Sequence, residues 1–225
     1  MQLPVMTIPY LLFALASVAH ADETSCNSYA FVEDHIKLAL VSVKVDPEQK
    51  LYFYKDEKSC PEKGDACKSK AYVLAGDELI SNQRRGDWVC AWYPGAKRET
   101  VGWVRVDRLQ NKISLAEASK AKPEEWLGNW AYYKYAELNI KKKGKLLGYE
   151  GNAVWDDGGG NNHVGSISGT MTPQANKAFL KEGTAENACK LELSLLGSYL
   201  VVKDNNVCGG LNVSFSGVYR KAKLK

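Results

Sequence analysis

Histidine is scarce in this sequence, and the few histidines lie far apart. Only three are present: His20 precedes an expected cleavage site, and His35 and His163 fall in different halves of the remaining chain. A cysteine nucleophile needs a free thiolate beside a base, and we expect all six cysteines to be oxidised. We therefore predict no catalytic residues and place an enzyme third among the candidate functions.

Motifs that bind metals or phosphates are missing as well. The chain has no C-x₂₋₄-C pair for zinc, and the run Asp156 to Asn162 lacks the alternating oxygen ligands of a calcium loop. The same run has no Lys-Ser/Thr pair for a phosphate loop. We predict no metal site and no cofactor. The mild net charge of +4, without an arginine-rich stripe, argues against nucleic acid as a partner.

Charged side chains are absent from the N-terminal segment, where residues 1–21 contain no Asp, Glu, Lys or Arg. An apolar run from Tyr10 to Ala16 is followed by Ala19-His20-Ala21, which has the small residues of a signal peptidase site. This run is far shorter than the ~20 residues of a membrane span. We predict a signal peptide over 1–21, cleaved near Ala21-Asp22, and a periplasmic or secreted chain without a transmembrane segment. An uncleaved anchor or a buried N-terminal helix is the alternative.

The cysteines are even in number and all follow the predicted signal peptide: Cys26, Cys60, Cys67, Cys90, Cys189 and Cys208. An even count in an exported chain indicates three disulfides. Turn-forming residues between Cys60 and Cys67 favour a local disulfide, and Cys189–Cys208 would join two neighbouring strands. Cys26 and Cys90 are then left as the third pair. The four cysteines of the first half allow three pairings, so their assignment stays open.

Short β-like segments separated by turn residues fill residues 22–112, which we predict to be the first domain. The expected strands are 36–41, 51–54, 71–74, 88–93 and 100–104. Residues 113–125 are rich in alanine and lysine, lack an apolar face and reach Pro123. They predict a linker with a short helix.

Residues 126–225 predict a second β domain, an antiparallel barrel or sandwich, which makes the fold class all-β. Lys143-Gly144-Lys145 separates two β-like segments and predicts a hairpin. Apolar and polar residues alternate over 191–195, 199–203 continues after a turn, and 211–219 alternates as the last strand. Alternation of this kind is typical of an antiparallel sheet with one buried face.

Three motifs in the first half resemble a bacterial SH3-like (SH3b) domain. They are Ala75-Gly76-Asp77 after a strand, Gly86-Asp87-Trp88-Val89 at the start of the next, and Gly102-Trp103-Val104 near the end. The resemblance covers about residues 69–110 and implies a small barrel and a non-enzymatic role in binding cell-wall peptides, glycans or proteins. The cysteines and the long segment 28–68 depart from the pattern of that family.

The second half is similar, over a shorter motif, to lipocalin-type barrels. Leu127-Gly128-Asn129-Trp130 matches their Gly-x-Trp sequence, and the resemblance implies that Arg220 stacks on Trp130. A chance Gly-x-Trp is the alternative. The half also resembles small periplasmic barrels that inhibit wall-cutting enzymes, although no inhibitory motif is present.

Aromatic residues crowd the first half and supply the predicted binding site. Because strand side chains alternate, the aromatic residues on the two sides of 88–93 do not all enter one core, so an aromatic surface is expected. Arginines at a neighbouring turn would pair with an acidic ligand. The predicted binding residues are Tyr54, Tyr72, Arg84, Arg85, Trp88 and Trp92. The alternative is that segment 28–68 covers this surface.

The glycine-rich run 156–163 is the second candidate site. A flexible hairpin accounts for the run, and contact with a protein partner is the alternative. Its candidate contact residues are Asp156, Asp157, Asn161 and His163. Two functions follow: recognition of peptidoglycan or a peptide through the aromatic surface, or inhibition of a wall- or membrane-active enzyme or toxin through this hairpin. Oligomeric state is not predicted.

Overall fold

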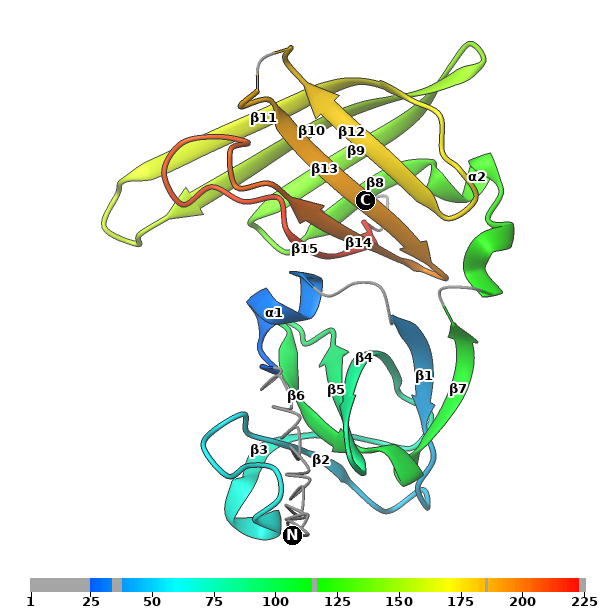
Figure 1. Cartoon of the computed structure of the whole chain (residues 1–225), viewed down its shortest axis with the longest axis vertical. Helices are drawn as coiled ribbons and strands as arrows, with labels where there is room; N and C mark the ends of the chain where they lie inside the picture. The colour runs from blue at the N-terminus through cyan, green and yellow to red at the C-terminus, as the bar shows by residue number, and fades with distance from the viewer. Residues whose placement is uncertain (1–24, 34–37, 115–116, 185, 223–225) are drawn as a thin grey trace, which may run out of the picture.

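The protein consists of two antiparallel β-sheets, one from each half of the chain, stacked one above the other (Figure 1). The structure, a computed structural model, describes residues 25–33, 38–114, 117–184 and 186–222. The predicted signal peptide and His35 lie outside these residues. The all-β prediction is confirmed. Among the described residues, no helix is both long and apolar enough to span a bilayer.

The lower sheet has seven strands in the order β3-β2-β6-β5-β4-β1-β7. Its strands are β1 (Ala39–Val43), β2 (Leu51–Tyr54), β3 (Lys68–Val73), β4 (Glu78–Arg85), β5 (Trp88–Tyr93), β6 (Thr100–Arg105) and β7 (Leu109–Ser114). Helix α1 (Ser28–Glu33) precedes them, and two 3₁₀ turns, η2 (Gly64–Cys67) and η3 (Val106–Arg108), connect strands. One side of the sheet closes over a core of Val, Leu and Phe side chains that includes Leu79, Val89 and Val104.

Strand β4 was not among the strands predicted from the sequence, because its middle is polar. Ser81, Asn82 and Gln83 are nevertheless buried. The Asn82 amide donates to the carbonyl of Phe31 at 2.9 Å, and the Gln83 amide donates to the carbonyl of Ser25. These two hydrogen bonds hold the N-terminal segment against the sheet. They also give partners to the buried amide groups, which would be costly to leave without them.

The upper sheet has eight strands in the order β11-β10-β9-β8-β15-β14-β13-β12 and forms a nearly closed barrel. Its strands are β8 (Gly128–Tyr132), β9 (Ala136–Lys143), β10 (Leu146–Asp156), β11 (Asn162–Met171), β12 (Lys177–Glu182), β13 (Cys189–Leu196), β14 (Tyr199–Asp204) and β15 (Gly217–Lys221). The first and last strands pair, whereas β11 and β12 form the two edges. A 3₁₀ turn, η4 (Glu117–Lys120), and a short helix, α2 (Pro123–Trp126), connect the two sheets.

The alternation predicted for the second half holds in β13. Leu191, Leu193 and Leu195 are buried inside the barrel, where they meet Trp130 and Phe215. The predicted hairpin at Lys143-Gly144-Lys145 is present between β9 and β10. Gly144 has a φ of +62°, which suits the first central position of a two-residue turn.

The prediction of a strand over 211–219 is wrong for its first part, because β15 begins only at Gly217. The cause is Asp204, whose side chain is 3% exposed. Its carboxylate accepts hydrogen bonds from the Phe215 amide at 2.5 Å and from the Ser214 and Ser216 hydroxyls at 3.1 and 3.3 Å. These bonds hold residues 214–216 around a buried carboxylate instead of along a neighbouring strand.

The two sheets share a hydrophobic cluster. Tyr199 and Val201 point outwards from the barrel and pack with Phe31 of α1 and Trp92 of β5, whereas Leu200 and Val202 point into the barrel core. Residues 199–202 of β14 are therefore buried on both sides, which explains why all four are apolar or aromatic. Burying such side chains stabilises the contact by about 1.5–3 kcal/mol each.

Three disulfides join the pairs that the sequence favoured: Cys26–Cys90, Cys60–Cys67 and Cys189–Cys208. The first ties the N-terminal segment to β5, and the Cys26 amide also donates to the Asp56 carboxylate at 2.6 Å. The third joins the start of β13 to the loop after β14. The described part of the chain contains no free cysteine.

The expected stacking of Arg220 on Trp130 is wrong. The register of β8 and β15 places Lys221 opposite Trp130 and Arg220 opposite Ala131. Consequently the Lys221 ammonium lies 5.0 Å from the centre of the Trp130 ring, and the Arg220 guanidinium lies 5.5 Å from that of Tyr133. Trp130 itself is fully buried, and its indole N–H donates to the carbonyl of Trp126 at 2.8 Å.

Candidate functional site

Trp92, predicted to bind ligand, is a packing residue. Its side chain is 2% exposed and meets the Tyr199 ring edge-on, with ring centres 5.6 Å apart. The side of β5 that carries Cys90 and Trp92 is covered partly by α1, as the alternative prediction required, and partly by β14. The second sheet thus removes this tryptophan from solvent.

The two arginines also have structural partners. They lie at the end of β4, not in a turn. The Arg85 guanidinium lies 4.4 Å from the centre of the Trp103 ring, forms an ion pair with Glu62 at 2.9 Å and donates to the Cys60 carbonyl. It therefore fastens the Cys60–Cys67 loop to the sheet. Arg84 remains exposed, and its Nε donates to the Gly86 carbonyl at 2.8 Å.

The other predicted aromatic residues lie in two places. Tyr54 packs against Trp88, with ring centres 4.5 Å apart, and both are partly exposed. Tyr72 is 43% exposed on the edge strand β3, and its ring centre lies 5.7 Å from that of Tyr52. Because Ser69 and Ala71 line the cleft described below, strand alternation directs Tyr72 away from it. The six predicted binding residues therefore do not form one surface.

The hairpin between β10 and β11 is ordered by its own side chains. The Asp157 carboxylate accepts hydrogen bonds from the Gly159 amide at 2.6 Å and from the Asn161 side chain at 2.7 Å. These bonds lower the pKa of Asp157 below its ordinary value. His163 stacks on Trp155, with ring centres 5.1 Å apart, and its Nδ1 lies 2.6 Å from the Leu211 carbonyl. The tip is thus internally hydrogen-bonded, with Asp156 in an ion pair with Lys134 at 3.6 Å.

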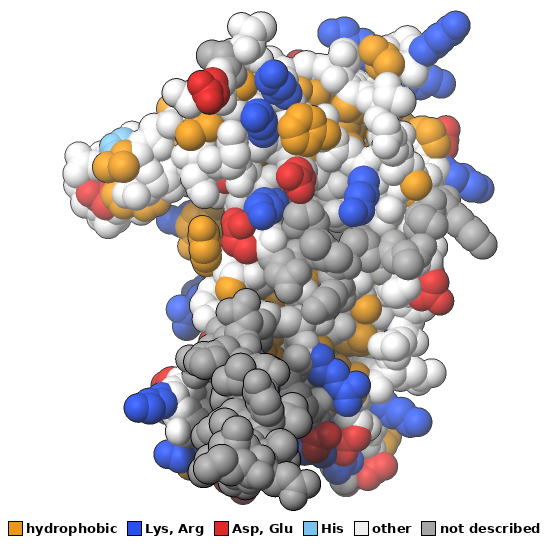
Figure 2. All heavy atoms as spheres, viewed as in Figure 1, with side chains coloured by type: hydrophobic (Ala, Val, Ile, Leu, Met, Phe, Trp, Pro, Cys, Tyr) orange, Lys and Arg blue, Asp and Glu red, His pale blue; other side chains and the backbone are white. Residues whose placement is uncertain are grey.

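A cleft of about 770 Å³ lies between the two sheets. In Figure 2 the molecule is hollowed on the left, between the protruding β10–β11 hairpin and the lower sheet. Both sheets contribute aromatic rings to the cleft, and polar groups come from the 98–100 turn and the loop after β14. The aromatic lining residues are Tyr29, Phe53, Tyr54, Tyr132, Tyr135 and Trp155.

Two hydrogen bonds join the sheets beside the cleft. The Tyr132 hydroxyl donates to the Glu99 carboxylate at 2.8 Å, and the Tyr133 hydroxyl donates to the Gly95 carbonyl at 3.2 Å. Burial, with Glu99 nearby, raises the pKa of Tyr132 above its ordinary value. These phenols therefore stay neutral, and their hydrogen bonds link the two sheets that form the walls of the cleft.

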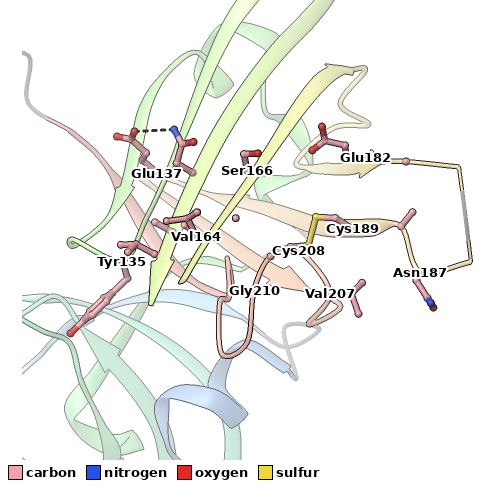
Figure 3. A pocket seen from close by; sticks show the side chains of 18 of the residues that line it. Tyr135, Glu137, Val164, Ser166, Glu182, Asn187, Cys189, Val207, Cys208 and Gly210 are labelled. Atoms are coloured by element: carbon pink, nitrogen blue, oxygen red, sulfur yellow. Dashed lines mark hydrogen bonds between the residues drawn. A yellow bond between two sulfur atoms is a disulfide. The ribbon is translucent and has the colours of Figure 1, made fainter. Parts of the chain in front are cut away.

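A second hollow, a groove of about 1130 Å³, lies at the end of the barrel. Figure 3 shows Tyr135 and Glu137 on one side of it, Asn187 on the other, and the Cys189–Cys208 disulfide beside it. Tyr135 and Val154 line both this groove and the cleft between the sheets. The two hollows therefore adjoin at these two residues, and they are together called the channel below.

The lining of the channel combines aromatic rings with polar side chains. Aromatic rings offer apolar area with polar tips, and pockets of similar volume hold small ligands. Glu137 and Glu182, the carboxylates along the groove, are exposed. A carboxyl that acts as a general acid near neutral pH is usually buried. Among the described residues no three His, Cys, Asp or Glu side chains converge as metal ligands.

No protein-family model, curated protein or solved structure matches this chain.

Five aromatic residues of the cleft lie outside the predicted sites: Tyr29, Phe53, Tyr132, Tyr135 and Trp155. Trp155 directly precedes the predicted hairpin site 156–163, and it lines the cleft that Tyr54 enters from the other sheet. The channel thus adjoins parts of both predicted sites, which sequence spacing alone does not bring together.

Proposed function

We propose that the protein is an exported, non-enzymatic binding protein that holds an extended cell-wall peptide or glycan chain. The observation that carries this proposal is the channel formed by the cleft and the groove, which meet at Tyr135 and Val154. An elongated channel with aromatic walls suits a chain of repeating units better than a compact molecule. Three disulfides support the expected export, because such bonds persist in oxidising compartments.

The aromatic rings are suited to recognition because they are already held in place. Trp155 is stacked on His163, and Tyr132 is tied to Glu99. Rigid rings lose little conformational entropy when a ligand covers them. Exposed polar groups at the margin, such as Arg98, are available for the carboxylates or amides of a wall peptide.

Binding of the mature protein to purified peptidoglycan, and to soluble fragments of it, tests this proposal. Tyr135→Ala is expected to weaken binding about tenfold to 100-fold, the loss typical of an aromatic contact residue. Tyr72→Ala is the matched control, since the two tyrosines are 40% and 43% exposed and only Tyr135 lines the channel. Loss of binding in Tyr72→Ala, with Tyr135→Ala unchanged, would contradict the channel and favour the edge strand.

A second candidate function, inhibition of a wall- or membrane-active enzyme or toxin, draws on the β10–β11 hairpin. Its tip projects from the barrel and is held by Asp157 (Figure 1). Exposed Val164 and Leu211 lie beside it and offer apolar area to a partner. Stoichiometric co-purification of such an enzyme, lost in Asp157→Ala together with Leu211→Ser, would support this function over the first.

A further inference from the structure

The net positive charge of the barrel is concentrated at one hairpin. Residues 126–225 contain 13 Lys and Arg against 8 Asp and Glu, a net charge of +5. Four of these positive charges, Lys141, Lys142, Lys143 and Lys145, lie within five consecutive residues at the β9–β10 turn. All four side chains are exposed. Among the ion pairs of the described residues, none includes them.

This hairpin tip projects beyond the rest of the barrel. Strand β8 pairs with β9 only as far as Ile140, and β11 pairs with β10 only from Leu147 onwards. Residues 141–146 therefore overhang their neighbours by about 10 Å, given a rise of about 3.3 Å per residue. Figure 1 shows the overhang at the upper right, and Figure 2 shows Lys and Arg side chains gathered at the same end.

The lysines surround the tip. Lys141 and Lys143 lie on the outer side of the hairpin, whereas Lys142 pairs with Leu147 and faces the barrel mouth. The two-residue turn at Gly144 holds them on a short, regular ladder. A hollow of about 470 Å³ adjoins the outer pair and is lined on its far side by Ser168 and Gly169.

The apex also exposes apolar area, because Leu146 is 41% exposed between the charged side chains. We propose that this tip docks end-on to an anionic phospholipid surface, with the lysines among the phosphates and Leu146 at the level of the headgroups. Each lysine near an anionic lipid surface raises the affinity of a protein for that surface about fivefold.

An acidic protein fits the tip less well. A helix or strand of a partner protein would contact only one side of the hairpin, whereas these lysines point to both sides. A flat anionic surface that contacts the end of the hairpin would reach the lysines on both sides. The tip and the channel also lie at opposite ends of β9, about 25 Å apart along its eight residues. Membrane contact would therefore leave the channel open to a ligand.

Co-sedimentation of the mature protein with vesicles tests the proposal. Binding is expected to vesicles of phosphatidylcholine and phosphatidylglycerol in a two-to-one ratio, and not to phosphatidylcholine alone. Changing Lys141, Lys142, Lys143 and Lys145 to Gln is expected to lower the affinity at least about 100-fold. The matched control changes Lys70, Lys177, Lys181 and Lys190 to Gln, which removes the same charge elsewhere and is expected to lose much less.

A soluble polyanion distinguishes a membrane from other acidic partners. Leu146→Ser is expected to weaken vesicle binding several-fold and to leave heparin binding unchanged, because only a lipid surface accepts the leucine. Equal losses in the tip variant and the control variant would overturn the proposal. It would also be overturned if the protein bound heparin and did not bind the anionic vesicles. Far-ultraviolet circular dichroism and thermal unfolding of each variant verify that the fold is retained.

Discussion

Replacement of Trp92 by alanine distinguishes a packing residue from a ligand-binding residue. Trp92 is buried between the sheets and contacts Tyr199 edge-on. Removing a buried tryptophan costs about 3–5 kcal/mol, because transfer free energy is lost and a cavity remains. We therefore expect Trp92→Ala to lower the free energy of unfolding by that amount, a large part of the ~5–15 kcal/mol of an ordinary domain.

The assay is urea unfolding followed by circular dichroism and by tryptophan fluorescence. Coincident transitions would indicate that the two sheets unfold together. A double-mutant cycle with Tyr199→Ala isolates the contact between the rings, and we expect a coupling of about 0.5–1.5 kcal/mol. Trp88→Ala serves as the control, since Trp88 lies on the same strand, is partly exposed and is expected to cost less.

The reasoning would be refuted if Trp92→Ala unfolded at the wild-type urea concentration while losing affinity for peptidoglycan. That result would return Trp92 to the exposed aromatic surface predicted from the sequence. It would also mean that the barrel does not cover this side of β5 in solution.

Three further outcomes follow from the structure. Asp204→Ala is expected to cost about 3 kcal/mol in unfolding free energy, because the buried amide of the 214–216 segment and two hydroxyls lose their acceptor; a loss below ~1 kcal/mol would contradict this role. Joint replacement of Cys26 and Cys90 by alanine opens a loop with a sequence separation of 64 and is expected to cost about 4 kcal/mol, measured by the same urea method on the oxidised proteins. Burial raises the pKa of Tyr132 and Tyr219, so the fold favours their neutral forms: this stabilisation is present below about pH 10 and is lost as the pH rises further. A spectrophotometric titration should therefore show these phenols ionising above the exposed tyrosines and together with unfolding; ionisation of every tyrosine near pH 10 in folded protein would be inconsistent with their burial.

Local patterns in the sequence predict much of this fold. Period-two alternation located β13, and turn residues located the hairpin at Gly144. The spacing of the cysteines favoured the three disulfides that the structure contains. These features depend on residues that are close in the chain or that belong to one strand, so their physical causes are visible locally.

Features that depend on contacts between distant segments were missed. The polar sequence of β4 is typical of a loop. Only the structure shows that Asn82 is buried and donates a hydrogen bond to the N-terminal segment. Asp204 shortens the last strand because its carboxylate accepts a hydrogen bond from the Phe215 amide, eleven residues further along the chain. The uninterrupted apolar run at Tyr199–Val202 was a signal of burial on both sides, and it identifies the surface of the barrel that covers Trp92.

The candidate site follows the same division. The sequence placed Tyr54 among binding residues and drew attention to the hairpin next to Trp155. The cleft itself arises from the packing of one sheet on the other, which no single segment encodes. The SH3b resemblance stays a prediction, and its motifs lie at the starts of β4 and β5 and within β6.

Hydrogen–deuterium exchange of the mature protein with a saturating peptidoglycan fragment tests the central claim most directly, because it locates the bound ligand. We expect slower exchange at 132–135, 154–155 and 212–216 of the barrel and at 98–101 of the lower sheet, the segments that line the channel. Protection confined to segments outside the channel, such as 39–43 and 109–114 at the opposite edge of the lower sheet, would contradict the account and place the ligand away from both hollows.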